Sequence, residues 1–211
     1  LFITSFQPIP FLFILSSSIA AAIVVEKNDH RIDMVFSSII LSILNIVFMF
    51  ALSIIVNVDS GFKAFSLFGV ALNAFISGIF ALGFLTPLEL WFNTASIFRL
   101  MDLSDTNNKI MKHLLVNASG TYHHSIMVAT LAESACRKIG ANPILARVGA
   151  YYHDIGKIDK PLYFSENQSD ENKHDDINPS MSVSVIKSHV KNGVELARQE
   201  TLPEEVIDII A

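Results

Sequence analysis

Apolar residues gather in three long stretches within the first 90 residues of the chain. Three segments of 25 residues each lack charged side chains: 1–25, 34–58 and 64–88. A helix needs about 20 apolar residues to cross the hydrocarbon core of a bilayer. We therefore predict three transmembrane helices, the first shortened because Pro8 and Pro10 interrupt its start. The predicted spans are about 9–25, 34–56 and 66–88. Burial in a soluble core is the alternative, but the short connecting loops disfavour it.

The second half of the chain carries signals for short helices. Asparagine precedes proline at 142–143 and 178–179, which places a capping side chain before a proline at the first helical position. Gly140 is a typical helix stop, and Thr201 with Glu204 has the spacing of a capping box. The predicted helices are about 125–139, 143–154, 179–191 with Gly193 after it, and one over EEVIDII. No segment alternates as a strand would, so we predict an all-α chain.

These patterns divide the chain into three parts. The predicted parts are a transmembrane region at 1–92, a helical connector at 93–118 and a soluble helical domain at 119–211. A polar loop, 165–176, interrupts the last of these. The connector has either a simple spacing role or a role in carrying a signal, and the sequence leaves both open.

Basic residues near the spans predict the orientation in the membrane. Lysine and arginine are enriched on the cytoplasmic side of membrane proteins. They are more numerous in the first loop and after the third span than in the second loop: Lys27 and Arg31, then Arg99, Lys109 and Lys112, against Lys63. We therefore expect the first loop and the soluble domain on the cytoplasmic side of a multi-pass protein.

Charge and cysteine content narrow the function classes. The net charge is −5 and the charged fraction is 17%, with no cluster of basic residues that would suit a nucleic-acid polymer. Cys136 is the single cysteine, so no disulfide forms within the chain, as is usual in a reducing compartment.

Histidines at helical spacing are the candidate chemistry of the soluble half. In the helix 125–139, the residues Val128, Leu131, Ala135 and Ile139 form an apolar stripe at helical spacing. His124 continues that stripe, so we expect it to point inward, and we expect His123 to point aside.

Two later helices add further candidates. His189 follows Val185 by four positions and Ile186 by three, which predicts an inner face for it as well. His153 and Asp154 end the helix between these two. A lone inward histidine is most often a hydrogen-bonded core residue. Three imidazoles and a carboxylate from successive helices instead favour a metal site, because buried polar groups need partners.

The two oxygens of Asp154 would allow it to bridge a pair of ions, His124 and His153 on one and His189 on the other. Two ions about 3.5–4 Å apart clamp the oxygens of an in-line phosphoryl displacement. Lys157, one turn past His153, has the charge to hold a phosphate oxygen. A solvated lysine after a helix end is the alternative of equal weight.

The strings GTYHHSIMVATLAE, GAYYHDIGKIDKP, FSENQ and IKSHVKNG resemble the HD-domain metal-dependent phosphohydrolases. Together with the membrane half they are similar to one branch, the PgpH-type seven-transmembrane receptors with an intracellular HD hydrolase domain. The resemblance implies a bacterial, membrane-anchored phosphodiesterase that hydrolyses cyclic di-AMP to pApA with two divalent ions, iron or manganese. It leaves a homodimer open.

The resemblance assigns roles to particular residues. It implies that His124, His153, Asp154 and His189 are metal ligands, and that Asp154 and Lys157 are catalytic. Lys157 and Asn167 would contact the substrate, whereas His174 has no counterpart.

The family's tandem histidine pair and final aspartate have no counterpart before Ala211, and the chain begins without methionine. We therefore expect a fragment that lacks turnover by itself. Two rival functions stay open: a receptor whose HD domain binds nucleotide without turnover, and an HD hydrolase of another phosphoester.

Overall fold

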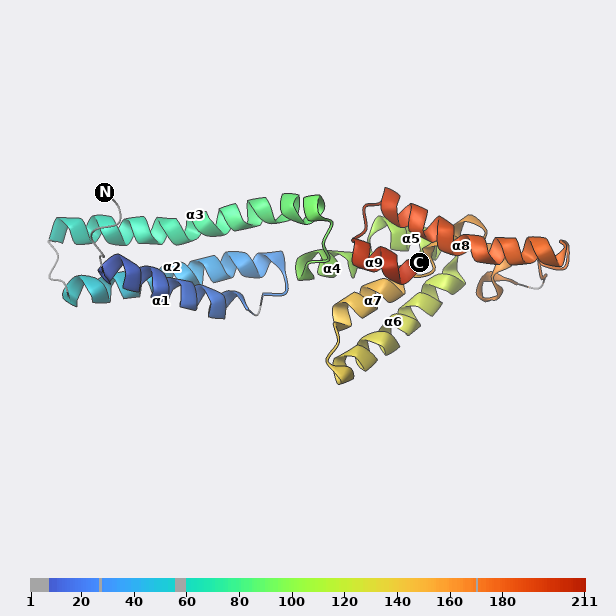
Figure 1. Ribbon diagram of the computed structural model, residues 1–211, viewed down its shortest axis with the longest axis horizontal. Coiled ribbons are helices and arrows are strands. Elements are labelled where there is room, and N and C mark those ends of the chain that lie inside the picture. The colour runs from blue at the N-terminus through green and yellow to red at the C-terminus, as the bar shows by residue number, and fades with distance from the viewer. Residues whose placement is uncertain (1–7, 27, 56–59, 170) are drawn as a thin grey trace. The chain divides into compact units, whose positions relative to one another are not determined.

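The computed structural model describes residues 8–26, 28–55, 60–169 and 171–211. These residues form helices and turns, with no strand among them, so the predicted all-α class is confirmed (Figure 1). The chain divides into two compact units, Leu1–Leu88 and Glu89–Ala211. We call them the membrane unit and the HD unit, and each is described by itself.

The membrane unit is built from three helices: α1 (Pro8–Val25), α2 (Arg31–Ile55) and α3 (Ser60–Phe92), whose last four residues belong to the HD unit. The segments Arg31–Ile55 and Ala64–Phe92 are long and apolar enough to cross a membrane. The described apolar part of α1, Pro10–Val25, is shorter, so the predicted count of three spans is not confirmed. Lys27 and the predicted span end at residue 56 lie outside the described residues.

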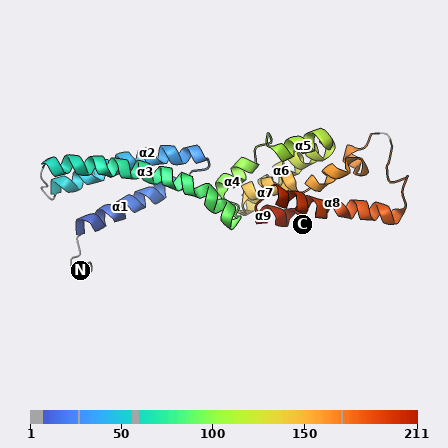
Figure 2. The ribbon, with the colours of Figure 1, turned by 90° about the horizontal axis from the view of Figure 1, so that it is seen from above.

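Polar and apolar side chains of the membrane unit take the positions expected in lipid. Phe36 and Ile43 are exposed, whereas Ser38 and Asn45 are buried against neighbouring helices. Gly78 of α3 allows close contact with α2, because a Cβ there would lie 1.8 Å from Ser38 Oγ. Small residues commonly allow membrane helices to approach in this way. Figure 2 shows α3 lying along α2.

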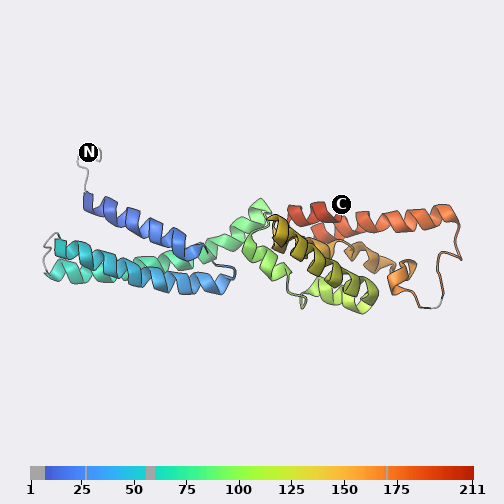
Figure 3. The same cartoon turned by 90° about the horizontal axis from the view of Figure 1, so that it is seen from below.

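The HD unit consists of helices and short 3₁₀ turns. In chain order they are α4 (Ile97–Leu103), α5 (Lys109–Asn117), α6 (Ser119–Ile139), α7 (Pro143–Tyr152), η1 (Ile155–Asp159), η2 (Pro161–Tyr163), η3 (Ser165–Asn167), α8 (Pro179–Gln199) and α9 (Glu204–Ile210). Helix α7 packs on α6 and on α9, and α8 packs on η1. The described residues between η3 and α8, 168–169 and 171–178, lie at one end of the unit (Figure 3).

One apolar core holds these helices together. Its most deeply buried members include Leu100, Leu114, Val148, Tyr152 and Ile155. The Tyr152 hydroxyl donates a hydrogen bond to the Leu103 carbonyl at 3.0 Å and accepts one from Asn108 Nδ2 at 2.6 Å. Tyr152 therefore fixes the C-terminal end of α7, immediately before His153.

Two helix boundaries differ from the sequence prediction. Helix α6 begins at Ser119 instead of about 125, and α8 continues past Gly193 to Gln199. Gly193 lies inside the helix, where it allows close packing. A Cβ there would lie 3.0 Å from Ile210 Cγ2 and 3.3 Å from the Gly156 nitrogen.

The predicted caps have mixed outcomes. Asn142 and Asn178 each accept hydrogen bonds from backbone N–H groups at their helix starts, and Gly140 ends α6 with a φ of 73°, as predicted. The predicted capping box of Thr201 and Glu204 is wrong. Thr201 takes a left-handed φ of 53°, and Pro203 precedes α9 without a side-chain cap.

Candidate metal centre

His153 and Asp154 lie where α7 ends, as the sequence predicts. The helix ends at Tyr152, His153 is its C-cap, and Asp154 leads into η1. The Asp154 carboxylate is buried, while His153 is half-buried. The turn from α7 into η1 therefore presents an imidazole and a carboxylate together.

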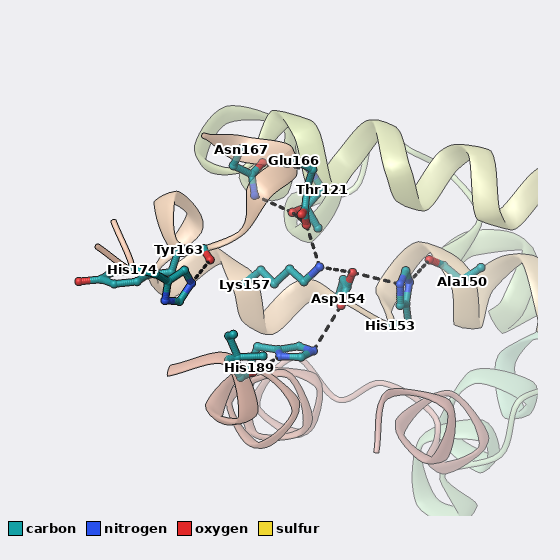
Figure 4. A network of polar contacts seen from close by, with 11 residues as sticks. Thr121, Ala150, His153, Asp154, Lys157, Tyr163, Glu166, Asn167, His174 and His189 are labelled. Atoms are coloured by element: carbon teal, nitrogen blue, oxygen red, sulfur yellow. Dashed lines mark hydrogen bonds and ion pairs between the residues drawn. The ribbon is translucent and has the colours of Figure 1, made fainter. Parts of the chain in front are cut away.

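Helix α6 brings a second imidazole to this pair. Potential ligand atoms of His124, His153 and Asp154 all lie within 4.8 Å of one another. The rings of His124 and His153 have centroids 5.5 Å apart. From α8, His189 Nε2 reaches to 3.5 Å from Asp154 Oδ1, while His153 Nε2 lies 3.1 Å from Asp154 Oδ2 (Figure 4). Three imidazoles, from α6, the end of α7 and α8, thus lie around the Asp154 carboxylate.

Backbone carbonyls determine which imidazole nitrogen faces the carboxylate. His153 Nδ1 donates to the Ala150 carbonyl at 2.8 Å, and His189 Nδ1 donates to the Ile186 carbonyl. A carbonyl only accepts, so the N–H is on Nδ1 and each Nε2 keeps its lone pair in the neutral ring. Metal-binding histidines in proteins are oriented in the same way.

The close contact between His153 Nε2 and Asp154 Oδ2 requires a positive charge, either a proton or a metal ion, between the two atoms. In the neutral tautomer, a nitrogen lone pair of His153 faces a carboxylate oxygen of Asp154, and two acceptors at 3.1 Å repel each other. Either a proton on Nε2 or a metal ion between the groups removes the repulsion. The donor set of imidazole nitrogen and carboxylate oxygen suits iron, manganese or zinc. The residues present therefore fit a metal ion.

Charges in the centre are strongly coupled. Burial opposes ionisation of Asp154, but the hydrogen bonds that protonated His153 and Lys157 donate outweigh it and hold the pKa of this carboxyl far below its ordinary value. The hydrogen bond to Asp154 raises the pKa of His153. Asp154 is therefore an anion across the physiological range, ready to hold a cation.

Lys157 and Glu166 extend the centre. Lys157 Nζ lies 2.7 Å from Asp154 Oδ2 and 2.7 Å from Glu166 Oε1. Burial lowers the pKa of Lys157, but its hydrogen bonds to the two carboxylates outweigh this and raise the pKa overall. Sequence reasoning missed Glu166, because it is an acidic residue in a polar loop without helical spacing to the histidines.

Gly156 explains how α8 comes so close to the carboxylate. A Cβ at Gly156 would lie 1.9 Å from the His189 carbonyl oxygen and 2.4 Å from the Gly193 nitrogen. A side chain there would push α8, and His189 with it, away from Asp154. The sequence contains this glycine directly after the HD pair, and only the packing shows its role.

The predicted inner face of α6 is wrong. Leu131 and Ile139 are 71% and 78% exposed, and the buried residues are instead Thr121, Ser125 and Ala129. Small side chains on this face allow the close packing of α6 on α7. His124 lies one position from the buried face, so it is exposed yet reaches His153 at the edge of the helix contact.

Three other polar residues lie outside the group. His123 is exposed and packs edge-on against Tyr122, with ring centroids 5.5 Å apart. His174 Nε2 bonds the Tyr163 carbonyl at 2.7 Å. Asn167, predicted to contact substrate, exchanges hydrogen bonds with Thr121 at the start of α6.

Both units of the chain match known protein families. The family model described as 7TM receptor with intracellular HD hydrolase matches residues 1–96, and the model described as HD domain matches residues 121–211. The chain is 37% identical over 202 residues to the cyclic-di-AMP phosphodiesterase PgpH of Bacillus subtilis. It is 36% identical over 203 residues to PgpH of Listeria monocytogenes. Both alignments cover 94% of this chain and 28% of the relative, so the chain spans under a third of their length.

The solved HD domain of L. monocytogenes PgpH is 50% identical in sequence to the part of this chain that it matches. The match covers 49% of this chain and 50% of that chain, with a TM-score of 0.49.

Proposed function

The chain belongs to the family of seven-transmembrane receptors with an intracellular HD hydrolase, and from this premise we propose that the protein is a membrane-anchored, metal-dependent phosphodiesterase that converts cyclic di-AMP to pApA. The two PgpH relatives carry the name cyclic-di-AMP phosphodiesterase. The observation that supports the proposal most strongly is the convergence of His124, His153 and His189 on the Asp154 carboxylate.

This geometry supports a proposed set of metal ligands. His124 and His153 would help to hold one divalent ion and His189 a second, Asp154 would contribute to both, and the metal would be iron or manganese. When bound, the pair would supply an activated water at neutral pH and a charge that stabilises the phosphate oxygens. The carbonyls of Ala150 and Ile186 hold the rings so that Nε2 faces the site.

Other side chains of the centre would act on the substrate. Lys157 carries the charge that holds a phosphate oxygen of the dinucleotide, and Phe164 packs against both Lys157 and His189. We assign Asn167 a place beside the substrate as part of the turn that covers the start of α6. Lys157 and Asn167 both lie in segments that follow His153 and Asp154 in the chain. One stretch of chain would therefore combine metal binding and substrate binding.

The membrane unit gives the location. The long apolar helices and the match to the receptor family make this a membrane protein. We propose a multi-pass arrangement in the bacterial cell membrane with the HD unit in the cytoplasm. A homodimer is compatible with this arrangement.

The activity is tested on the full protein in detergent, loaded with Mn²⁺ or Fe²⁺ and supplied with cyclic di-AMP. We expect pApA as the product and loss of turnover after chelation. Binding of cyclic di-AMP without hydrolysis would favour the receptor function. Hydrolysis of other phosphoesters in preference to cyclic di-AMP, across a panel of cyclic dinucleotides, nucleotides and short RNAs, would contradict the proposed substrate.

A further inference from the structure

Lys157 and a bound metal ion would compete for the same carboxylate oxygen of Asp154. Its ammonium lies 2.7 Å from Asp154 Oδ2, the same oxygen that faces His153 Nε2. The side chain is only 13% exposed, so the ammonium is held in the centre and not in bulk water. Lys157 therefore neutralises the buried Asp154 carboxylate in the metal-free protein.

Glu166 gives the same ammonium a second anion. Lys157 Nζ lies 2.7 Å from Glu166 Oε1. Asp154 and Glu166 are the two carboxylates that it meets among the residues the structure describes. The Phe164 ring, with its centroid 4.9 Å from Nζ, adds a favourable face for the cation. Lys157 thus has a place to remain when it leaves Asp154.

Glu166 is anchored independently of the metal ligands. Thr121 Oγ1 donates to Glu166 Oε1 at 3.0 Å, and Asn167 Nδ2 donates to Thr121 Oγ1 at 2.8 Å. The Thr121 N–H in turn donates to Asn167 Oδ1 at 3.0 Å. Gly120 lets this turn lie against α6, since a Cβ there would fall 1.8 Å from the Glu166 carbonyl oxygen. The Glu166 carboxylate therefore keeps its position whichever partner Lys157 takes.

A divalent ion and an ammonium cannot share one carboxylate oxygen at hydrogen-bond distance without strong repulsion in a buried site. Metal binding at Asp154 must therefore displace Lys157, and the cost depends on what the ammonium meets next. With Glu166 present the ammonium keeps a fixed anion that it already contacts at 2.7 Å. Without Glu166 it has Asp154 as its remaining carboxylate among the described residues, and it competes with the metal ion for it.

We propose that Lys157 is an exchangeable counter-cation of Asp154, and that Glu166 is the positioning residue that receives it when metal binds. This inference rests on the metal site of the proposed function. It adds that Glu166 sets metal affinity through Lys157 without being a ligand, and that it leaves the ammonium placed beside the site for the substrate phosphate.

The test measures Mn²⁺ binding to the full protein in detergent by isothermal titration calorimetry, with no substrate present. Glu166→Gln should weaken Mn²⁺ binding by roughly tenfold, in the range that supporting residues of metal sites show. Adding Lys157→Met to Glu166→Gln should restore the affinity to within about twofold of wild type, because the competing cation is gone. Glu171→Gln, in the same polar loop but highly exposed, is the matched control and should change nothing.

A second readout is thermal unfolding of the metal-free protein. Lys157→Met alone should lower its melting temperature, because Asp154 loses its counter-cation, and Mn²⁺ should remove the difference. A merely structural role for Glu166 would also weaken binding, but Lys157→Met would not rescue it. Failed rescue, or wild-type affinity in Glu166→Gln, would overturn this inference alone. Absence of Mn²⁺ binding in the wild type would overturn the proposed metal site, and this inference with it.

Discussion

The two units of the chain bury opposite kinds of side chain. In the membrane unit, large apolar residues such as Phe36 and Ile43 face outward, while Ser38 and Asn45 lie inside. In the HD unit, Leu114 and its apolar neighbours form the core. The same residue types therefore occupy opposite positions, because lipid surrounds one unit and water the other.

The units also differ in the charge of what they bury. Among the described residues, the buried polar side chains of the membrane unit are uncharged: Asn28, Ser37, Ser38, Asn45 and Ser53. The HD unit buries Glu89, Arg99 and Asp154. A buried charge is costly unless partners surround it, so its presence indicates a structural network or a functional site. In this chain, we propose that Asp154 with its three histidines and a lysine is the functional case.

Removing the buried charge of the HD unit should have the largest effect. Asp154→Ala should lower cyclic-di-AMP hydrolysis by roughly 10⁴-fold, as loss of a central catalytic group does. It should also abolish Mn²⁺ binding, because Asp154 faces both His153 and His189. Far-ultraviolet circular dichroism should show unchanged helix content. Activity close to wild type would contradict the proposed role of Asp154 as a ligand of both ions.

Exchanging leucine and asparagine between the units tests the contrast in burial directly. Leu114→Asn places an amide in the apolar HD core and should lower the free energy of unfolding by about 3–5 kcal/mol. Asn45→Leu should change the membrane unit by less than about 1 kcal/mol, because buried polar contacts between membrane helices contribute little. Asn45 Oδ1 has no hydrogen-bond partner in the described part of the chain.

Hydrogen exchange on the full protein in detergent measures both substitutions in their own units. Equal loss of protection in the two units would show that the membrane unit has a conventional apolar core.

Two adjacent histidines of α6 provide a finer contrast within the HD unit. His124→Ala should weaken Mn²⁺ binding by about 10–100-fold, whereas His123→Ala should change it by less than about twofold. The reason is that His124 reaches His153 and Asp154, while His123 packs on Tyr122. Calorimetric titration of each variant decides the matter, and equal losses would show that the position of His124 is misassigned.

The smallest expected effect concerns a charge pair between α6 and α7. Hydrogen bonds from Arg147, chiefly, hold the pKa of Glu133 below its ordinary 4.5. The stabilisation is therefore present above about pH 4.5 and is lost as the pH falls through the lower folded-state pKa. Glu133→Gln should cost less than about 1 kcal/mol at pH 7, and the difference from wild type should shrink below pH 4.5. Urea unfolding from pH 7 to pH 3 measures it, with Glu195→Gln as an exposed control. A difference independent of pH would contradict the ionic origin.

Local signals predicted the parts of this structure that depend on neighbouring residues. The helix that ends just before His153 follows from Asn142, Pro143 and an apolar run, and His189 lies on the buried face of α8 with Val185. Hydropathy likewise located α2 and α3.

Features that depend on contacts between distant segments could not be predicted from the sequence. The apolar stripe on α6 exists, yet the helix buries Thr121 and Ser125 instead, because small residues allow α7 to approach. Glu166 reaches the centre from a polar loop, and Gly156 matters only through its approach to α8. No local pattern distinguishes these residues from ordinary loop positions.

The most direct test of the account is anomalous diffraction from crystals of the protein grown with Mn²⁺. The account predicts an anomalous peak bonded to imidazole nitrogens of His124 and His153 and to an Asp154 oxygen, with Lys157 closer to Glu166 than to Asp154. A peak elsewhere in the HD unit, or these three side chains with no ion between them, would contradict it.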